Sequence, residues 1–212
     1  MKSKLIIGIQ PYLDLASQLW SELDPELKLV TLEINQDSNY FFDLSELAKF
    51  SPKQFSAFVA CDHQFLNFRR LELMSELKKI GFCMPSLLAK SAYIGKDAII
   101  GENCFICPGT VIGPKAKLGF NCFIGSLSSV NQGAVLGNSV WLGTAVHIGM
   151  HCKIGSNSTV LYHSAIANNV EIGKQVLIEK PGFYNKSIQD KSFFLQKSNL
   201  DVSIIGNGPR VI

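Results

Sequence analysis

Two histidines, His147 and His151, combine the side chain and the spacing that best suit proton transfer in this sequence. They stand four residues apart in the stretch VHIGMHCKIG at positions 146–155. An imidazole has an ordinary pKa close to neutrality, so either histidine can take a proton from an amine or a hydroxyl group. The alternative is that both are solvated histidines on an outer surface. The pair is the first candidate for a general base, ahead of the isolated His163.

The cysteines offer a second kind of chemistry, metal binding. Cys104 and Cys107 form a C-x-x-C sequence, which is often half of a zinc site. No second pair completes a set of four ligands in the sequence. We therefore expect reduced structural thiols and no bound metal.

These residues belong to a sequence that repeats every six positions from Leu88 to Gly182. Ile, Leu or Val occupies each sixth position, a small residue follows four positions later, and glycine often follows the aliphatic residue directly. A period of six fits neither an α-helix nor an alternating strand. It is typical of a parallel β-helix, in which each hexad forms one short strand and a corner. The sequence predicts a left-handed parallel β-helix of sixteen hexads, with aliphatic and small side chains inside and glycine or asparagine at corners of positive φ.

Aromatic residues recur at the spacing of one coil, eighteen residues, at Phe105, Phe123 and Trp141. Each precedes an inward aliphatic residue, so the three should form an outward ladder on one face. We expect another chain or the C-terminal segment to cover this ladder, and we expect a homotrimer built around a threefold axis. Leu161 takes a corner position where glycine is usual, so its replacement should cost little stability.

The first 86 residues lack this repeat. Strands are expected at 4–9, 27–34 and 55–61, and helices at 13–23, 43–50 and about 64–80. This alternation predicts a small parallel α/β domain of the Rossmann-like kind. The expected division is an α/β domain at 1–86 that holds a sugar nucleotide, a β-helix at 87–182 and a C-terminal extension at 183–212.

Composition limits the classes of partner. A net charge of +3 is too small and too dispersed to favour nucleic acid. No apolar run has the length of a membrane span, and the run at residues 5–9 is too short for the core of a signal peptide. We expect a cytoplasmic protein that neither binds nucleic acid nor inserts into a membrane.

The combination of these parts resembles the two-domain hexapeptide-repeat sugar acyltransferases of the sialic-acid O-acetyltransferase and bacillosamine N-acetyltransferase type. The resemblance rests on the strand KLIIG at 4–8, on FVAC at 58–61 with its following helix, on the hexads, and on the ending IIGNGPRVI at 204–212. It implies a trimer that takes acetyl-CoA between neighbouring prisms and a nucleotide sugar near the N-terminal domain. It also implies a histidine as proton acceptor.

One departure from the family pattern lies after the first strand. The family has a glycine-rich turn there, whereas this chain has GIQPYLD at 8–14, in which only Gly8 remains and Pro11 has no N–H to offer. A nucleotide sugar must then be held differently, by stacking on Tyr12 or by hydrogen bonds to Asp62 and His63 at the end of the third strand. The alternative is that Asp62 only caps the following helix and that His63 is an ordinary surface residue.

A second departure concerns the base. Gln132 stands where the resemblance places the family histidine, and Trp141 holds the next site where the family often has one. Glutamine can orient a hydroxyl group but cannot accept a proton at neutral pH. The stretch VHIGMHCKIG resembles the HIAHDC phrase of the lipid A UDP-GlcNAc acyltransferases, which assigns the catalytic role to His147 and His151.

Positive side chains and one loop in the last third of the sequence suit the phosphates of acyl-CoA. The candidates are Lys180 and the loop that runs from Gly206 to Arg210, although spread lysines also serve as a charged surface. The leading hypothesis is an acyl-CoA-dependent N- or O-acyltransferase that acts on a nucleotide-linked or free amino sugar in bacterial surface-glycan biosynthesis. The alternative is a catalytically inert relative that acts as a binding or assembly scaffold, because both the glycine-rich turn and the base histidine are replaced.

Overall fold

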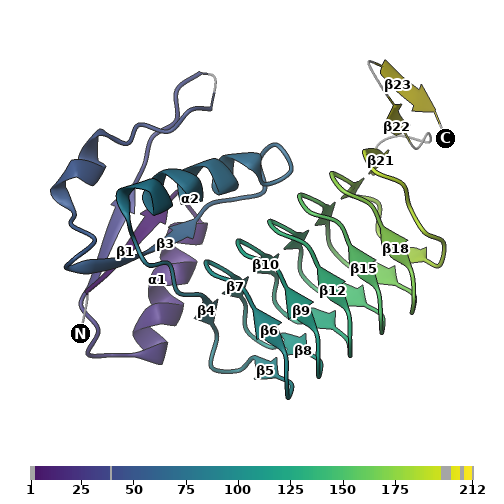
Figure 1. Ribbon diagram of the computed structural model, residues 1–212, viewed down its shortest axis with the longest axis horizontal. Helices are drawn as coiled ribbons and strands as arrows, with labels where there is room; N and C mark the ends of the chain where they lie inside the picture. Colours follow the sequence, from purple (N-terminus) through teal and green to yellow (C-terminus); the bar gives the residue numbers. More distant parts are fainter. Residues whose placement is uncertain (1–2, 39, 197–201, 206–207, 212) are drawn as a thin grey trace.

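The computed structural model describes residues 3–38, 40–196, 202–205 and 208–211, with side chains described up to residue 196. An α/β layer lies at one end of a long prism of short strands (Figure 1). Its three parallel strands have the order β2-β1-β3, with β1 (Ser3–Gly8), β2 (Leu29–Glu33) and β3 (Phe55–Ala60). The helical segments are α1 (Tyr12–Leu23), the 3-10 helix η1 (Ser45–Lys49) and α2 (Phe68–Ile80). No helix among the described residues has the length and apolar character needed to cross a bilayer.

Both faces of the small sheet are covered, which explains the continuous apolar run in β1. Leu5 and Ile7 pack with α2 side chains such as Leu73, whereas Ile6 and Phe58 pack toward α1 and the prism. The sheet is therefore the middle layer between α2 on one side and α1 with the prism on the other.

Helix α2 begins at Phe68, later than the expected position near residue 64. Phe65, Leu66 and Asn67 have φ values of 49°, 53° and 67°, which a right-handed helix does not allow. The interpretation of Asp62 as the cap of this helix is wrong, because Asn67 holds the N-cap position. Asp62 instead accepts a hydrogen bond from the backbone N–H of Gln64 at 3.1 Å.

The prism is built from three parallel sheets, here called the first, second and third faces. Strands eighteen residues apart pair in register throughout, for example Phe123 with Trp141 and Lys153 with Glu171. The first face contains β4 (Leu87–Leu88), β7 (Phe105–Ile106), β10 (Phe123–Ile124), β13 (Trp141–Leu142), β16 (Thr159–Val160), β19 (Leu177–Ile178) and β21 (Ser192–Phe194). The second face contains β5 (Tyr93–Ile94), β8 (Val111–Ile112), β11 (Ser129–Val130), β14 (His147–Ile148), β17 (Ala165–Ile166) and β20 (Phe183–Tyr184). The third face contains β6 (Ile99–Ile100), β9 (Lys117–Leu118), β12 (Val135–Leu136), β15 (Lys153–Ile154) and β18 (Glu171–Ile172).

The inside of the prism is a column of aliphatic and small side chains, including the free thiols of Cys104, Cys122 and Cys152. Antiparallel strands β22 (Val202–Ile205) and β23 (Gly208–Val211) extend the first face at the far end. The predicted fold class, a left-handed parallel β-helix with a small N-terminal α/β domain, is confirmed. The division at residues 86 and 182 stays a prediction.

The corners differ in one respect from the expectation. The positive φ falls on the residue before the small one, for example Asn121 and His151, and not on the glycine after the aliphatic residue. That glycine is needed for close approach of the coils, since a Cβ on Gly95 would lie 2.5 Å from the backbone nitrogen of Pro114. The asparagines at these corners do have the predicted positive φ.

The aromatic ladder is covered by the protein's own N-terminal layer, so the expectation that another chain or the C-terminal segment covers it is wrong. Phe123 and Trp141 stack with ring centroids 3.8 Å apart, and Tyr12 meets the Trp141 ring edge-on at 5.3 Å. Phe58 from β3 meets Phe105 in the same way at 5.5 Å. The apolar sides of α1 and β3 need a partner surface, and the ladder provides it. The ladder therefore gives no support to the predicted homotrimer.

Leu161 also belongs to this interface. Its side chain is 8% exposed and packs in the cluster that joins α1 to the first face. The expected small stability cost rests on the hexad pattern alone, which carries no information about what the N-terminal layer covers.

A line of polar corner residues fixes the N-terminal layer to the prism. The buried Arg70 of α2 donates to the backbone carbonyls of Asn103, at 2.9 Å, and Asn121. The side-chain oxygen of Asn103 accepts the backbone N–H of Val59 in β3 at 2.9 Å. The Asn67 amide donates to the Ser139 carbonyl at 2.8 Å. The N-terminal layer is thus held by directional hydrogen bonds as well as by apolar contact.

Candidate functional site

The first candidate region lies where the carboxyl ends of β1 and β3 meet the prism. Five residues form it, and they are called the junction cluster: Tyr12, Asp62, His63, Trp141 and Tyr162. The chain leaves β1 toward β2 on one side and β3 lies on the other, so this edge is the switch point of the sheet. Ligands of open parallel sheets bind at such points.

Tyr12 packs against the aromatic ladder at the edge of the cluster. Its ring meets Phe123 at 5.7 Å and Trp141 at 5.3 Å. Burial, with smaller effects of the nearby Tyr162 and Asp62, raises the pKa of Tyr12 to about 12. The hydroxyl group therefore stays protonated at neutral pH and can donate a hydrogen bond.

His63 is half-buried, and the interpretation of it as an ordinary surface residue is wrong. Its ring centroid lies 5.3 Å from that of Trp141. Burial lowers the pKa of His63, while the carboxylates of Asp62 and Glu179 act in the opposite direction. Its Nδ1 is buried and has no hydrogen-bond partner among the described residues. The site thus holds a neutral imidazole, and the only sequence signal for it is the pair Asp62–His63 directly after a buried strand.

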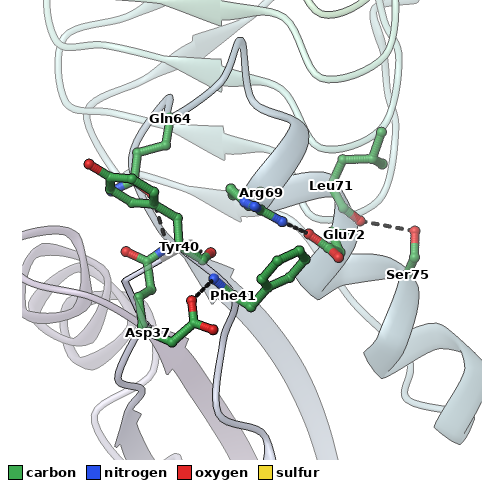
Figure 2. A network of polar contacts seen from close by, with 9 residues as sticks. Asp37, Tyr40, Phe41, Gln64, Arg69, Leu71, Glu72 and Ser75 are labelled. Carbon is green, nitrogen blue, oxygen red and sulfur yellow. Dashed lines mark hydrogen bonds and ion pairs between the residues drawn. The ribbon is translucent and has the colours of Figure 1, made fainter.

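The segment after β2 that contains Gln36, Tyr40 and Phe41 contacts the segment that carries His63 (Figure 2). The Gln36 amide donates to the side-chain oxygen of Gln64 at 2.9 Å and to the Tyr40 carbonyl at 3.2 Å. Arg69 lies over the ring of Phe41 at 4.2 Å and pairs with Glu72 at 2.7 Å. These contacts link residues 36–41 to the start of α2 and so position the junction cluster. The sequence did not predict them, because they join loops without a periodic pattern.

The second candidate region, called the outer histidine corner, consists of Gln132, His147 and His151. The side chains of all three are exposed. His147 Nδ1 lies 3.0 Å from the Ser129 hydroxyl of the neighbouring coil. The backbone N–H of His151 donates to the Gln132 carbonyl at 3.1 Å, and the His151 ring lies so close over Gly133 that a Cβ there would be 2.6 Å from Nδ1. The structure therefore brings Gln132 and His151 together on adjacent coils, one corner after His147.

An open groove of about 640 Å³ runs along the third face beside this corner. It is lined by rungs of β12, β15 and β18 and by residues 187–190. Lys153 pairs with Glu171 at 2.6 Å in its wall, and the Lys174 backbone N–H donates to Asp190 at 2.8 Å. His151 precedes β15 by two residues, and the lining residues of the groove begin on this coil at Lys153.

The predicted cofactor residues are distributed differently. Lys180 is exposed after β19, and its carbonyl accepts the Tyr184 hydroxyl at 2.6 Å. Gly206 lies outside the described residues, and Arg210 lies in β23, where only the backbone is described. The predicted site residues thus fall into two groups, with Tyr12, Asp62 and Trp141 at the junction and the remaining described ones elsewhere on the prism.

Comparison with solved structures shows the same fold along the whole chain. PerB from Caulobacter crescentus, in complex with CoA and GDP-perosamine, superposes with a TM-score of 0.79 at 17% identity, covering 100% of this chain and 98% of that one. The acetyltransferase domain of PglB from Neisseria gonorrhoeae has a TM-score of 0.66 at 18% identity, with 100% of both chains covered. WeeI from Acinetobacter baumannii has a TM-score of 0.64 at 17% identity, again with 100% of both chains covered. The predicted resemblance to two-domain hexapeptide-repeat sugar acyltransferases is confirmed at the level of the fold.

Sequence comparison gives the family. No curated protein matches the chain by sequence. Residues 82–190 match the family described as the GMPPB C-terminal domain, which is just over half of the 212 residues. The match begins shortly before β4 and ends in the segment that lines the third-face groove. The chain therefore belongs to the GMPPB C-terminal domain family.

Proposed function

We propose that this protein is an acyl-CoA-dependent N- or O-acyltransferase that acts on a sugar in the biosynthesis of bacterial surface glycans. The observation that carries the proposal is the full-length match in fold to PerB and to the PglB acetyltransferase domain, whose structures hold CoA with GDP-perosamine and acetyl coenzyme A, respectively. The junction cluster adds support, because it places polar groups at the switch point where sheets of this kind bind ligands.

The proposed reaction is direct acyl transfer. The amine nitrogen or hydroxyl oxygen of the sugar attacks the thioester carbonyl carbon, a new C–N or C–O bond forms, and the C–S bond breaks. The attacking group loses one proton to a base, and the departing CoA sulfur takes up one proton. His147 and His151 are the proposed bases, and Gln132 orients the attacking group by a hydrogen bond. The contact of His147 Nδ1 with Ser129, at 3.0 Å, favours this role because it holds the ring and leaves Nε2 free to point outward.

The acyl donor is proposed to lie on the prism side of the molecule. Lys180, Gly206 and Arg210 are the proposed partners of the CoA phosphates. The third-face groove is a suitable channel because it is open and has Lys153 and Lys174 in its walls. On the acceptor side, Tyr12, Asp62 and Trp141 are the proposed contacts with the sugar.

A homotrimer in the cytoplasm, where acyl-CoA is available, remains part of the proposal. Its support comes from the second face, where Tyr93, Val111 and Phe183 are 59%, 40% and 68% exposed. These apolar side chains lie along the same face as His147. A neighbouring prism on that face would bury them and enclose the outer histidine corner.

The test is acetyl-CoA turnover on a panel of free and nucleotide-linked amino sugars, followed by chromatographic detection of released CoA. His151→Asn suits the positive φ of 58° at this corner, so it removes the base without backbone strain. Loss of a positioned base lowers the rate by about 10²–10⁴-fold, and at least one of His147→Asn and His151→Asn should show this. The matched control is Lys115→Asn, at the same corner two coils earlier with φ of 58°. Full activity in both histidine variants would assign the base to another group.

The alternative function is a catalytically inert scaffold. The observation that favours it is Gln132, which stands where the resemblance places a histidine. Calorimetry and the turnover assay together separate the two functions. An inert scaffold would bind acetyl-CoA in calorimetry but would release no CoA with any member of the panel, whereas an acyltransferase would do both.

A further inference from the structure

We propose that the junction cluster binds an acceptor that carries an amine and hydroxyl groups but no phosphate at this edge of the sheet. A free amino sugar fits this description, whereas a nucleotide sugar with its diphosphate at the start of α1 does not. The inference rests on the proposed acyl transfer for its biological purpose, and on the residues of the cluster for its chemistry.

The start of α1 has lost the features that hold a phosphate. A helix N-terminus binds an anion through free backbone N–H groups and the positive end of its dipole. Here Pro11 has no N–H, and the N–H of Leu13 already donates to the Ile9 carbonyl at 3.1 Å. Asp14 places a carboxylate in the first turn, where it neutralises the dipole and repels a phosphate.

Gly8, the remaining residue of the family's glycine-rich turn, has a different purpose in this fold. A Cβ on Gly8 would lie 1.8 Å from the carbonyl oxygen of Ala60 in β3. The glycine is therefore required for the close approach of β1 and β3. Its presence is no sign that a ligand approaches the backbone here.

The charges around the cluster favour a cation. The charged groups that act on His63 are the carboxylates of Asp62 and Glu179, and those that act on Tyr12 also include Asp62. Lys180 follows Glu179 but is exposed and shifts neither pKa. Arg69, near the start of α2, pairs with Glu72. An ammonium group fits beside the carboxylates of Asp62 and Glu179, whereas a phosphate group would be repelled by them.

The neutral groups of the cluster suit hydroxyl groups. His63 Nδ1 lacks a partner among the described residues, and a buried polar atom without a partner costs free energy that a ligand hydroxyl group can offset. The protonated Tyr12 hydroxyl is a donor, and Tyr162, 51% exposed, offers a second hydroxyl and a ring face at the rim. An amino sugar combines the amine and the hydroxyl groups that these two features would bind.

Isothermal titration of the full chain at pH 7 tests this inference. The probes are glucosamine, galactosamine and mannosamine, their N-acetyl derivatives, and UDP. At least one amino sugar should bind more tightly than its N-acetyl form, and UDP should not bind at the same concentrations. Asp62→Asn should weaken amino-sugar binding about tenfold, since it removes a charged hydrogen-bond partner. Tyr12→Phe is a second variant with the same expectation, in case Asp62→Asn does not fold. Glu26→Gln, which changes an exposed carboxylate outside the cluster, should bind as the wild type does.

Tighter binding of UDP than of every amino sugar would overturn the inference. Unchanged amino-sugar affinity in folded Asp62→Asn and Tyr12→Phe would also overturn it. Its failure is distinguishable from failure of the proposed function. Turnover of acetyl-CoA only with UDP-linked sugars would support the proposed acyltransferase activity and overturn the inference about the acceptor. Selective binding of an amino sugar without any turnover would support that inference and contradict the proposed activity.

Discussion

Trp141 and His147 lie one hexad apart in the chain, yet their surroundings are opposite. Trp141 is 2% exposed and packs against Phe123, Tyr12 and His63. His147 is exposed, and its ring nitrogen Nδ1 lies 3.0 Å from the hydroxyl group of Ser129. The difference arises because the N-terminal layer covers the first face and leaves the second face free. One repeat thus supplies both a buried junction, built from distant segments, and an open corner, built from adjacent coils.

The contrast between the covered first face and the open second face predicts the largest loss of stability for substitutions in the aromatic ladder. Trp141→Ala should lower the free energy of unfolding by about 3–5 kcal/mol, because it leaves a cavity between Phe123, Tyr12 and His63. Ile99→Ala, on the third face and 57% exposed, is the control outside both the ladder and the proposed trimer face, and it should change this free energy by less than about 0.5 kcal/mol. Equal losses in chemical denaturation would show that the covered first face does not differ from an open face in this way.

Leu161 and Leu127 test the same contrast with two leucines, one buried under the N-terminal layer and one exposed. Leu161→Ala should cost about 2 kcal/mol, at the lower limit for a buried leucine, since the side chain keeps 8% exposure at the rim of the interface. Leu127, at a left-handed corner and 64% exposed, is the control, and its replacement by Asn should be close to neutral. A thermal shift for Leu161→Ala as small as that for Leu127→Asn would contradict the assigned interface.

The hydrogen bonds between the N-terminal layer and the prism should contribute less to the free energy of unfolding than the aromatic ladder does. Asn103→Ala leaves the buried N–H of Val59 without its acceptor and should cost about 1–3 kcal/mol. Asn169→Ala, at an exposed corner with φ of 60°, controls for the loss of asparagine at a left-handed position. If both variants unfold at the same denaturant concentration, the hydrogen bonds of Asn103 do not hold the N-terminal layer.

The smallest expected effect is a dependence of stability on pH. The pKa of His63 is lowered by burial, so between that value and the ordinary value of about 6.5 the unfolded chain binds more protons than the folded one. Stability contributed by the neutral imidazole is therefore present above about pH 6.5 and is lost as the pH falls toward the folded pKa. His63→Gln should show a flatter profile in denaturation experiments between pH 7 and 5. Parallel profiles would mean that the His63 pKa is not lowered.

The sequence was sufficient to predict the prism because its signal is periodic. Register follows from the eighteen-residue coil, and the inward positions of Ile124 and Cys122 follow from the hexad alone. The same logic placed Phe105, Phe123 and Trp141 in one ladder. It could not place His63 on Trp141, because that contact joins segments 78 residues apart by sequence number and depends on three successive left-handed residues, Phe65, Leu66 and Asn67.

One missed signal was nevertheless visible. Asn103 and Asn121 stand one coil apart, and Asn157 continues the line two coils later. The positive φ of a corner is enough to explain asparagine at these positions. In the structure, however, Asn103 accepts a hydrogen bond from β3, and the Asn157 amide donates to the Leu66 carbonyl at 3.1 Å. Asparagines repeated along one corner are buried here. A buried side-chain amide needs hydrogen-bond partners, so this repetition indicates that another segment of the chain packs against the corner.

The most direct test of the division between an acceptor side and a reacting side compares Tyr12→Phe with His151→Asn in steady-state acetyl-CoA turnover. Tyr12→Phe should raise the KM for the acceptor about tenfold with little change in kcat, because it removes a binding hydrogen bond. His151→Asn should lower kcat with little change in that KM, because it removes a group needed only during the reaction. If both variants lower kcat equally, or if neither changes either constant, the junction cluster and the outer histidine corner do not divide binding and catalysis.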